Sequence, residues 1–248
     1  KGVVTAKKQG RATIWAKLVY RSGGKKRTRN FSCKVTIKGK SEPASNTVEK
    51  PGGPQNELET NQPEQTVSKL KIIAEGVPVE VRLASDGQYS YKYNKDEYAV
   101  MTTTNGLVFE IKVTSIRPWT GGGNQTNVII CIPDQSYTLI TCILAGSTLI
   151  LPEINVNITI SSKASTVVSS LPSDYNKTLN YTGNASSCLL SMNEIKDFAI
   201  KAKIFTSSVL LQSSWPEYDM RSPSYNYTSG NGTAKINIDI KGSSFIFE

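Results

Sequence analysis

The chain has 248 residues, 38% of them hydrophobic and 20% charged, which is enough to bury one large core or two smaller ones. It contains no His, which excludes zinc sites of the Cys/His type and every catalytic arrangement that needs an imidazole. The net charge of +9 has its source in residues 1–41, which hold 13 Lys and Arg and no acidic residue.

Residues 1–39 are predicted to form strands. The apolar and β-branched stretches are Gly2–Thr5, Arg11–Tyr20 and Asn30–Ile37, and a basic turn containing Gly23 and Gly24 joins the last two. The strings G-V-V-T-A-K-K-Q-G-R-A-T-I and C-K-V-T-I in this segment resemble the C-terminal half of a bacterial group-two immunoglobulin-like domain. The resemblance implies a partial β-sandwich module at 1–39. Half a sandwich cannot close its own core, so this module is expected to be mobile, to pack on other residues, or to be completed by residues outside this chain.

Residues 40–66 are predicted to be a flexible linker. They are rich in Pro, Gly, Glu and Asn and nearly free of apolar residues, so they cannot bury enough surface to order themselves.

A second domain is predicted at 67–248, because short apolar runs resume there and recur roughly every ten residues without a helical stripe. Alternation is clean at Ile154–Ile160 and Ala234–Ile240, where β-branched residues alternate with polar ones. The fold class is therefore all-β. Buried faces rich in Ile and Val, with small turn residues, favour a single-stranded right-handed β-helix (solenoid), and a β-sandwich is the alternative.

Three motifs in this domain resemble those of a bacterial putative-adhesin family of unknown function: V-I-I-C-I-P at Val128, L-P-S-D-Y-N-K-T-L-N-Y at Leu171, and S-G-N-G-T-A-K-I-N-I-D-I-K-G-S-S-F at Ser229. The resemblance covers about 68–248 and implies a β-helix displayed at the cell surface, with no established reaction. The chain has few of the Gly residues usual at the coil turns, which leaves the number of coils open.

The basic first segment predicts contact with a polyanion, such as an anionic cell-wall polymer or a glycan. The candidate residues are Lys7, Lys8, Arg11, Lys25, Lys26, Arg27 and Arg29. The alternative is a solvated strand surface with no ligand. Nucleic acid is not expected as a partner, and no apolar run approaches the roughly 18 residues of a membrane span.

Aromatic residues in turn-like segments are the candidates for ligand binding in the second domain, because amphipathic rings suit sugar faces and protein surfaces. They are Trp119, Trp215, Tyr218, Tyr225 and Tyr227. The alternative is that these rings fold back and cap the end of the solenoid core.

Neighbouring carboxylates leave a glycan-processing enzyme open, because glycosidases use a pair of acids. The pairs are Asp96/Glu97, Glu194/Asp197 and Glu217/Asp219, all in polar contexts. The four Cys lie in apolar strands and are expected to be buried thiols, with a Cys131–Cys142 disulfide as the alternative. We expect no cofactor and no metal.

These observations predict a non-enzymatic, adhesin-like bacterial protein that is secreted or lies at the cell surface. It would bind or display at the cell envelope, and its partner would be wall polymer, glycan, or a host or bacterial surface protein. A glycan-processing β-helix and a purely structural spacer are the alternatives.

Overall fold

A computed structural model describes residues 10–22, 25–37, 57–60, 62–63, 66–117, 126–134, 137–192, 194–212, 215–216 and 222–248. The chain divides into two compact units, Lys1–Gly52 and Gly53–Glu248. The described residues include no helix long and apolar enough to cross a membrane.

The first unit contains an antiparallel hairpin of β1 (Gly10–Ser22) and β2 (Lys25–Ile37). The register pairs Gly10 with Ile37 and Ser22 with Lys25, so every residue of one strand has a partner on the other. The prediction of strands at 11–20 and 30–37 agrees with this hairpin, whereas the predicted strand at 2–5 lies outside the described residues.

The second unit is all-β in its described residues. Its strands are β3 (Glu57–Glu59), β4 (Lys69–Glu75), β5 (Pro78–Ala84), β6 (Ser90–Tyr93), β7 (Tyr98–Asn105), β8 (Val108–Ser115), β9 (Val128–Pro133), β10 (Leu139–Ala145), β11 (Thr148–Leu151), β12 (Asn157–Lys163), β13 (Thr166–Ser170), β14 (Thr178–Asn184), β15 (Ser187–Ser191), β16 (Phe198–Phe205), β17 (Ser208–Leu210), β18 (Ser224–Ser229), β19 (Ala234–Lys241) and β20 (Ser244–Phe247). Strand β3 lies within the range predicted as linker and pairs with β6, so order in this unit begins before residue 67.

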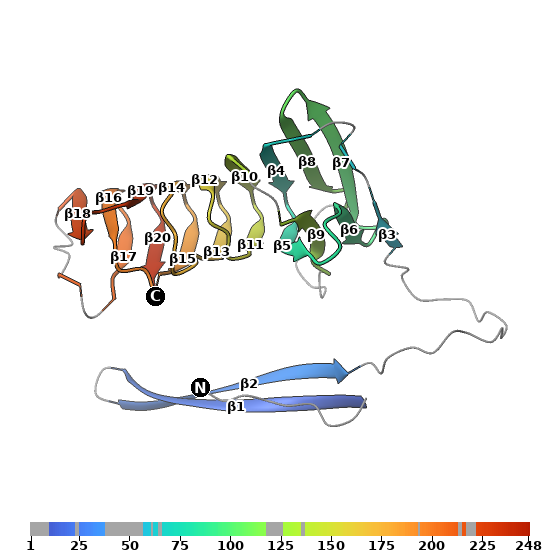
Figure 1. Ribbon diagram of the computed structural model, residues 1–248. Helices are drawn as coiled ribbons and strands as arrows, with labels where there is room; N and C mark the ends of the chain where they lie inside the picture. Colours follow the sequence, from blue (N-terminus) through green and yellow to red (C-terminus); the bar gives the residue numbers. More distant parts are fainter. Residues whose placement is uncertain are drawn as a thin grey trace. The chain divides into compact units, whose positions relative to one another are not determined.

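The strands of the second unit form two stacked, mostly parallel sheets of nine strands each (Figure 1). The first sheet has the order β18-β16-β19-β14-β12-β10-β4-β8-β7 and the second β17-β20-β15-β13-β11-β5-β9-β6-β3. Consecutive strands such as β10 and β11 therefore make one rung, with one strand in each sheet. Parallel pairing of successive rungs is the arrangement of a β-helix, which confirms that prediction over the β-sandwich.

The spatial order of the rungs departs from the chain order at both ends of the sheets. Rung β8–β9 lies on one side of β4–β5, and the following rung, β10–β11, lies on the other side. At the other end, β19–β20 lies between β14–β15 and β16–β17, although it follows both in the chain. The antiparallel strands β7 and β18 form the two edges of the first sheet.

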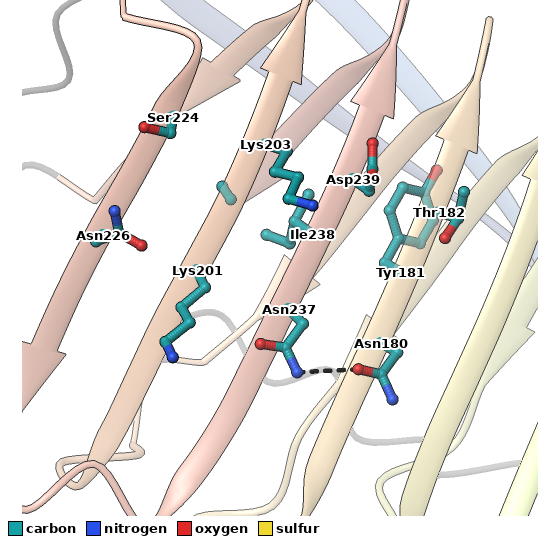
Figure 2. A pocket seen from close by; sticks show the side chains of 11 residues that line it. Asn180, Tyr181, Thr182, Lys201, Lys203, Ser224, Asn226, Asn237, Ile238 and Asp239 are labelled. Atoms are coloured by element: carbon teal, nitrogen blue, oxygen red, sulfur yellow. Dashed lines mark hydrogen bonds between the residues drawn. The ribbon is translucent and has the colours of Figure 1, made fainter.

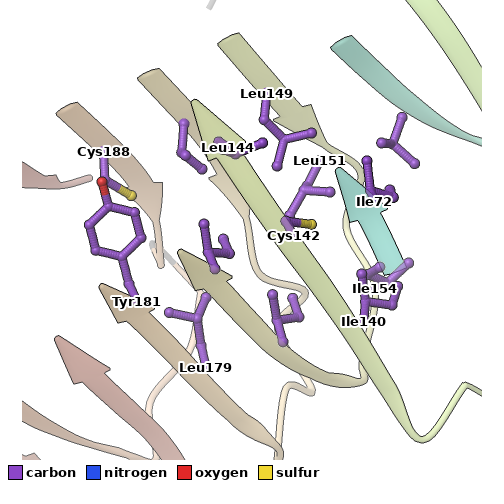
Figure 3. Close-up of a cluster of buried hydrophobic side chains, with 14 of the residues drawn as sticks. Ile72, Ile140, Cys142, Leu144, Leu149, Leu151, Ile154, Leu179, Tyr181 and Cys188 are labelled. Carbon is purple, nitrogen blue, oxygen red and sulfur yellow. The ribbon is translucent and has the colours of Figure 1, made fainter. Parts of the chain in front are cut away.

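The core lies between the two sheets and follows directly from the alternating sequence (Figure 3). Residues in register on neighbouring strands form continuous inward rows. One row of the first sheet is Leu70, Ile140, Ile158, Leu179, Ile236 and Ile200, each at most 1% exposed. Burial of each such side chain contributes about 1.5–3 kcal/mol. Cys131, Cys142 and Cys188 are free thiols, so the Cys131–Cys142 disulfide is not formed. Cys142 and Cys188 are buried in this core as predicted, whereas Cys131 is only half-buried.

A tight turn that repeats from rung to rung connects the two sheets. Each turn contains one residue with a left-handed backbone, followed in most rungs by Ser. The left-handed residues are Gly76, Gly146, Ala164, Ala185, Thr206 and Gly242, with φ between 48° and 68°. Ala164, Ala185 and Thr206 therefore form coil turns without Gly, although this backbone conformation is strained for a residue with a side chain. The small number of Gly residues in the sequence does not limit the number of coils.

The Ser side chains of these turns form a hydrogen-bonded ladder along the stack. The backbone N–H of Ser147 donates to Ser165 Oγ at 3.0 Å, and that of Ser165 donates to Ser186 Oγ at 3.3 Å. Ser186 N–H continues the series to Ser243 Oγ, and Ser243 N–H to Ser207 Oγ. Each hydroxyl in turn donates to the carbonyl two residues before it. The ladder satisfies backbone groups that would otherwise be buried without a partner.

Candidate functional site

A groove of about 540 Å³ lies on the outward face of the first sheet, across β14, β19, β16 and β18 (Figure 2). Strand alternation places one set of side chains inward, so Tyr181, Ala202 and Ile238 are buried beneath the groove. The outward set on the same strands is polar: Asn180, Thr182, Lys201, Lys203, Ser224, Asn226, Asn237 and Asp239.

Amide side chains and one Lys form a row across the groove. Asn226 pairs in register with Lys201, Lys201 with Asn237, and Asn237 with Asn180. Asn237 Nδ2 donates a hydrogen bond to Asn180 Oδ1 at 2.9 Å, which orients both amides (Figure 2). An Asn amide has two N–H donors and an acceptor oxygen, so this bond leaves Asn180 Nδ2 and Asn237 Oδ1 for a ligand.

In the described residues, the two Lys of the groove form no ion pairs of the kind found elsewhere on the same sheet. Toward its other end, Lys71 Nζ lies 2.9 Å from Glu110 and Lys112 Nζ lies 3.4 Å from Glu75. Within the described part of the chain, no ion pair involves Lys201 or Lys203, and the register neighbours of Lys201 are both Asn. Lys203 lies in register with Ser224 and Asp239.

Trp215, Tyr225 and Tyr227 are the predicted aromatic residues that the structure describes. They lie at the end of the β-helix that also carries the polar groove. Trp215 is half-buried, with its ring centroid 5.1 Å from that of Phe198, 5.0 Å from Phe247 and 5.7 Å from Tyr227. Tyr225 is 7% exposed, and its hydroxyl donates to the Pro216 carbonyl.

These contacts favour the capping alternative for Trp215 and Tyr225, since their rings are largely occupied by core residues. Their role as ligand-binding rings stays a prediction. Trp119 and Tyr218 lie outside the described residues.

The predicted polyanion-binding residues belong to the first unit. Arg11 is in β1, and Lys25, Lys26, Arg27 and Arg29 are in β2. The register pairs Arg21 with Lys26. Lys7 and Lys8 lie outside the described residues, and polyanion binding by this segment stays a prediction.

The carboxylates considered for glycan cleavage are partly engaged in structural bonds. Asp197 accepts hydrogen bonds from the Thr233 N–H at 3.0 Å and the Thr233 hydroxyl at 2.6 Å, and these bonds lower the pKa of Asp197. Glu97 accepts one from the Thr126 hydroxyl. Glu217 and Asp219 lie outside the described residues. The described residues contain no cluster of three side chains that could hold a metal ion.

A second groove, of about 590 Å³, contains carboxylates that the sequence reasoning did not select. Asp134, Glu153 and Asp174 line it together with Lys177. Asp134, Glu153 and Asp174 lie in the segments that follow β9, β11 and β13, which are strands of the second sheet.

The polar groove was missed by sequence reasoning, although part of its signal is visible in the sequence. Lys201 and Lys203 alternate with apolar residues, which predicts an outward position for both. Their neighbours could not be read in the same way, because β19 lies between β14 and β16 against the chain order.

Comparison with known proteins identifies a solved structure with a similar fold. No family profile and no curated protein matches the chain. A solved structure described as a putative cell adhesion protein from Clostridium sporogenes ATCC 15579 is similar over 79% of this chain and 99% of its own, with a TM-score of 0.52 and 14% identity. A putative adhesin (BF0245) from Bacteroides fragilis NCTC 9343 aligns over the same shares with a TM-score of 0.31 and 10% identity. The chain thus shares its fold with the solved Clostridium sporogenes structure.

Proposed function

We propose that this chain is part of a non-enzymatic, adhesin-like bacterial protein, secreted or at the cell surface, that binds its ligand through the outward face of the β-helix. The observation that carries the proposal is the groove across β14, β19, β16 and β18, where two Lys without ion pairs lie among Asn side chains. The fold likeness to a structure described as a cell adhesion protein supports it.

The basic hairpin of the first unit supplies a second contact, with anionic polymer of the cell wall. The support is its charge: residues 1–41 hold 13 Lys and Arg and no acid, and the register sets Arg21 opposite Lys26. Such a one-sign segment attracts polyanions, and salt screens the attraction. The hairpin would hold the protein on the wall, and the β-helix would carry the separate ligand-binding groove.

Two alternatives predict different behaviour. A glycan-processing enzyme would use the acids of the second groove, Asp134, Glu153 and Asp174, and would release reducing ends from polysaccharides. A structural spacer would bind nothing through either unit. The engagement of Asp197 by Thr233 supports a structural role for that carboxylate.

Co-sedimentation with purified bacterial cell wall and with whole cells tests the proposal. The full chain is compared with a hairpin variant carrying Lys25→Gln, Lys26→Gln, Arg27→Gln and Arg29→Gln, at low and high salt. We expect salt-sensitive wall binding that the hairpin variant reduces, and cell binding that this variant retains. If the protein binds neither wall nor cells, the structural-spacer alternative is supported. If reducing sugar is released, the glycan-processing alternative is supported.

A further inference from the structure

We propose that the groove across β14, β19, β16 and β18 binds an anionic oligosaccharide, with an acidic group between Lys201 and Lys203 and hydroxyl groups on the Asn side chains. This inference rests on the proposed function, because it assigns a ligand class to the same face of the β-helix.

The charge of the groove carries the first step. Lys201 and Lys203 are exposed and lie two positions apart on β16, so strand alternation places both on the outward face. Toward the other end of this sheet, Lys71 and Lys112 are neutralised across the strands by Glu110 and Glu75. An acidic group on a ligand would supply the counter-charge that the described residues do not provide for Lys201.

The amides carry the second step. A sugar hydroxyl is both a donor and an acceptor, and neighbouring hydroxyls of a sugar ring match a donor beside an acceptor. The bond from Asn237 Nδ2 to Asn180 Oδ1 leaves this arrangement, with an N–H donor on Asn180 and a carbonyl acceptor on Asn237. Asn226, opposite Lys201 on β18, extends the row on the other side.

The dimensions suit an oligosaccharide. The groove crosses four neighbouring strands, β14, β19, β16 and β18. Three interstrand spacings of about 4.8 Å make it about 14 Å long. The pairing of β14 with β19 and of β19 with β16 fixes the spacing of the polar side chains, so the site is set by the sheet itself.

Other ligand classes lack their recognition groups here. Single-stranded nucleic acid needs aromatic platforms on which bases stack. The aromatic residue that lines the described groove, Tyr181, is 1% exposed and belongs to the core. A peptide strand would need a free backbone edge, which only β18 offers among these four strands. The strands that carry Lys201, Lys203, Asn180 and Asn237 each have a strand on both sides.

Two sources of the acidic group share this chemistry: the carboxylate of a uronic acid and the phosphodiester between the sugars of a sugar phosphate polymer. The test separates them with three probes, trigalacturonate, its trimethyl ester and an oligomer of phosphodiester-linked hexoses. The ester has the same sugar rings without the charge. Binding is measured by titration calorimetry with the full chain carrying the four Gln substitutions in the hairpin, which lowers the charge of the first unit, and each groove variant is made on this same background.

We expect the background protein to bind at least one of the two anionic probes and the ester at least tenfold more weakly. Lys201→Gln and Lys203→Gln should each weaken binding by about fivefold, the effect of about 1 kcal/mol for an exposed charge pair. Asp239→Asn should strengthen binding, because it removes a negative charge beside Lys203. Lys71→Gln, on the same sheet but paired with Glu110, is the matched control and should change nothing.

Equal binding of trigalacturonate and its ester would overturn the charge assignment, and unchanged affinity in the Lys201→Gln, Lys203→Gln double variant would overturn the site. Absence of binding to both anionic probes would also overturn the inference. If the chain still binds cells in these cases, the proposed function stands with another ligand. If it binds neither cells nor wall, the proposed function fails as well.

Discussion

The ring of Tyr181 occupies the space in which a side chain at position 183 would lie, and Gly183 has no side chain. The two residues lie two positions apart on β14 and face the core, and a Cβ on Gly183 would lie 2.8 Å from Tyr181 Cε1 and 3.2 Å from Ile240 Cγ2. The Tyr181 ring also packs edge-on against Phe245, with ring centroids 5.2 Å apart. A large and a small residue therefore fill one layer of the core together.

Gly183→Ala should destabilise the second unit by about 1–3 kcal/mol, because the added methyl group overpacks the core against Tyr181. Urea denaturation followed by circular dichroism measures the loss. Tyr181→Leu should relieve the clash, so the double variant Gly183→Ala, Tyr181→Leu should lose less than the sum of the two single variants. Additive losses would contradict the steric explanation.

Replacing strained turn residues by Gly should stabilise the β-helix. Ala185 has φ 50° and Thr206 has φ 48°, where a side chain costs about 1–2 kcal/mol. Gly also increases the conformational entropy of the unfolded chain, which offsets part of this gain. Ala185→Gly should therefore raise the free energy of unfolding by roughly 0.5–1 kcal/mol. The reverse change, Gly146→Ala, is the control and should lower it, since φ is 60° there although space is open. The thermal midpoints of the three proteins measure the sign.

Ser165→Ala should cost about 1–3 kcal/mol, because it leaves the buried N–H of Ser147 without its acceptor. It also removes the hydroxyl that donates to the Lys163 carbonyl at 2.7 Å. Ser161→Ala, at an exposed position of β12, is the matched control and should change stability by less than about 0.5 kcal/mol. Equal midpoints of chemical unfolding would show that the ladder contributes nothing.

Trp215→Ala should lower the stability of the β-helix and leave cell-wall binding of the folded protein unchanged, because the Trp215 ring contacts Phe198, Phe247 and Tyr227. Trp215→Phe should retain most of the stability, since it keeps an aromatic ring. The thermal midpoint and wall sedimentation are measured on the same samples. Loss of binding without loss of stability would instead favour the ligand-binding interpretation of Trp215.

Alkaline pH should weaken the fold through Cys142. Burial raises the pKa of its thiol from 9.0 to about 12, and its register neighbours Ile72 and Ile160 carry no charge. The unfolded thiol therefore ionises first, so this contribution to stability is complete below pH 9 and is lost as the pH rises toward 12.

Cys142→Val removes this contribution, because Val cannot ionise and fills a similar buried position. The difference in free energy of unfolding between the two proteins should stay constant from pH 6 to 8 and change above pH 9 in favour of the variant. Parallel curves up to pH 11 would contradict the assignment. Cys188, whose pKa burial also raises, stays in both proteins and cancels from the comparison.

The sequence predicts those features that depend on neighbours along the chain. Alternation at Ile236, Ile238 and Ile240 correctly indicates strand and buried face, since each is at most 3% exposed. The absence of helical periodicity and the β-branched content lead to the β-helix. What alternation cannot supply is the partner of each strand, because parallel pairing brings together residues far apart in the chain, such as Asn180 and Asn237.

The turns show a second limit of sequence reasoning. The expectation that coil turns need Gly leaves Ala164, Ala185 and Thr206 unrecognised, although all three have the same left-handed backbone as Gly146. The Ser that follows each of them is the better signal. Its hydroxyl and backbone bond to neighbouring turns, and these bonds offset the strain at the residue before it.

The place of β19–β20 between β14–β15 and β16–β17 affects how the protein acquires its structure. A solenoid whose rungs follow the chain can grow by adding each new rung to the last. Here β16 and β17 leave the ribosome before the strands that they pair with, so they have no parallel neighbour until β19 and β20 arrive. Strands β19 and β20 must insert between the two rungs that precede them in the chain. Lys201 and Asn237 become neighbours only when β19 takes this place.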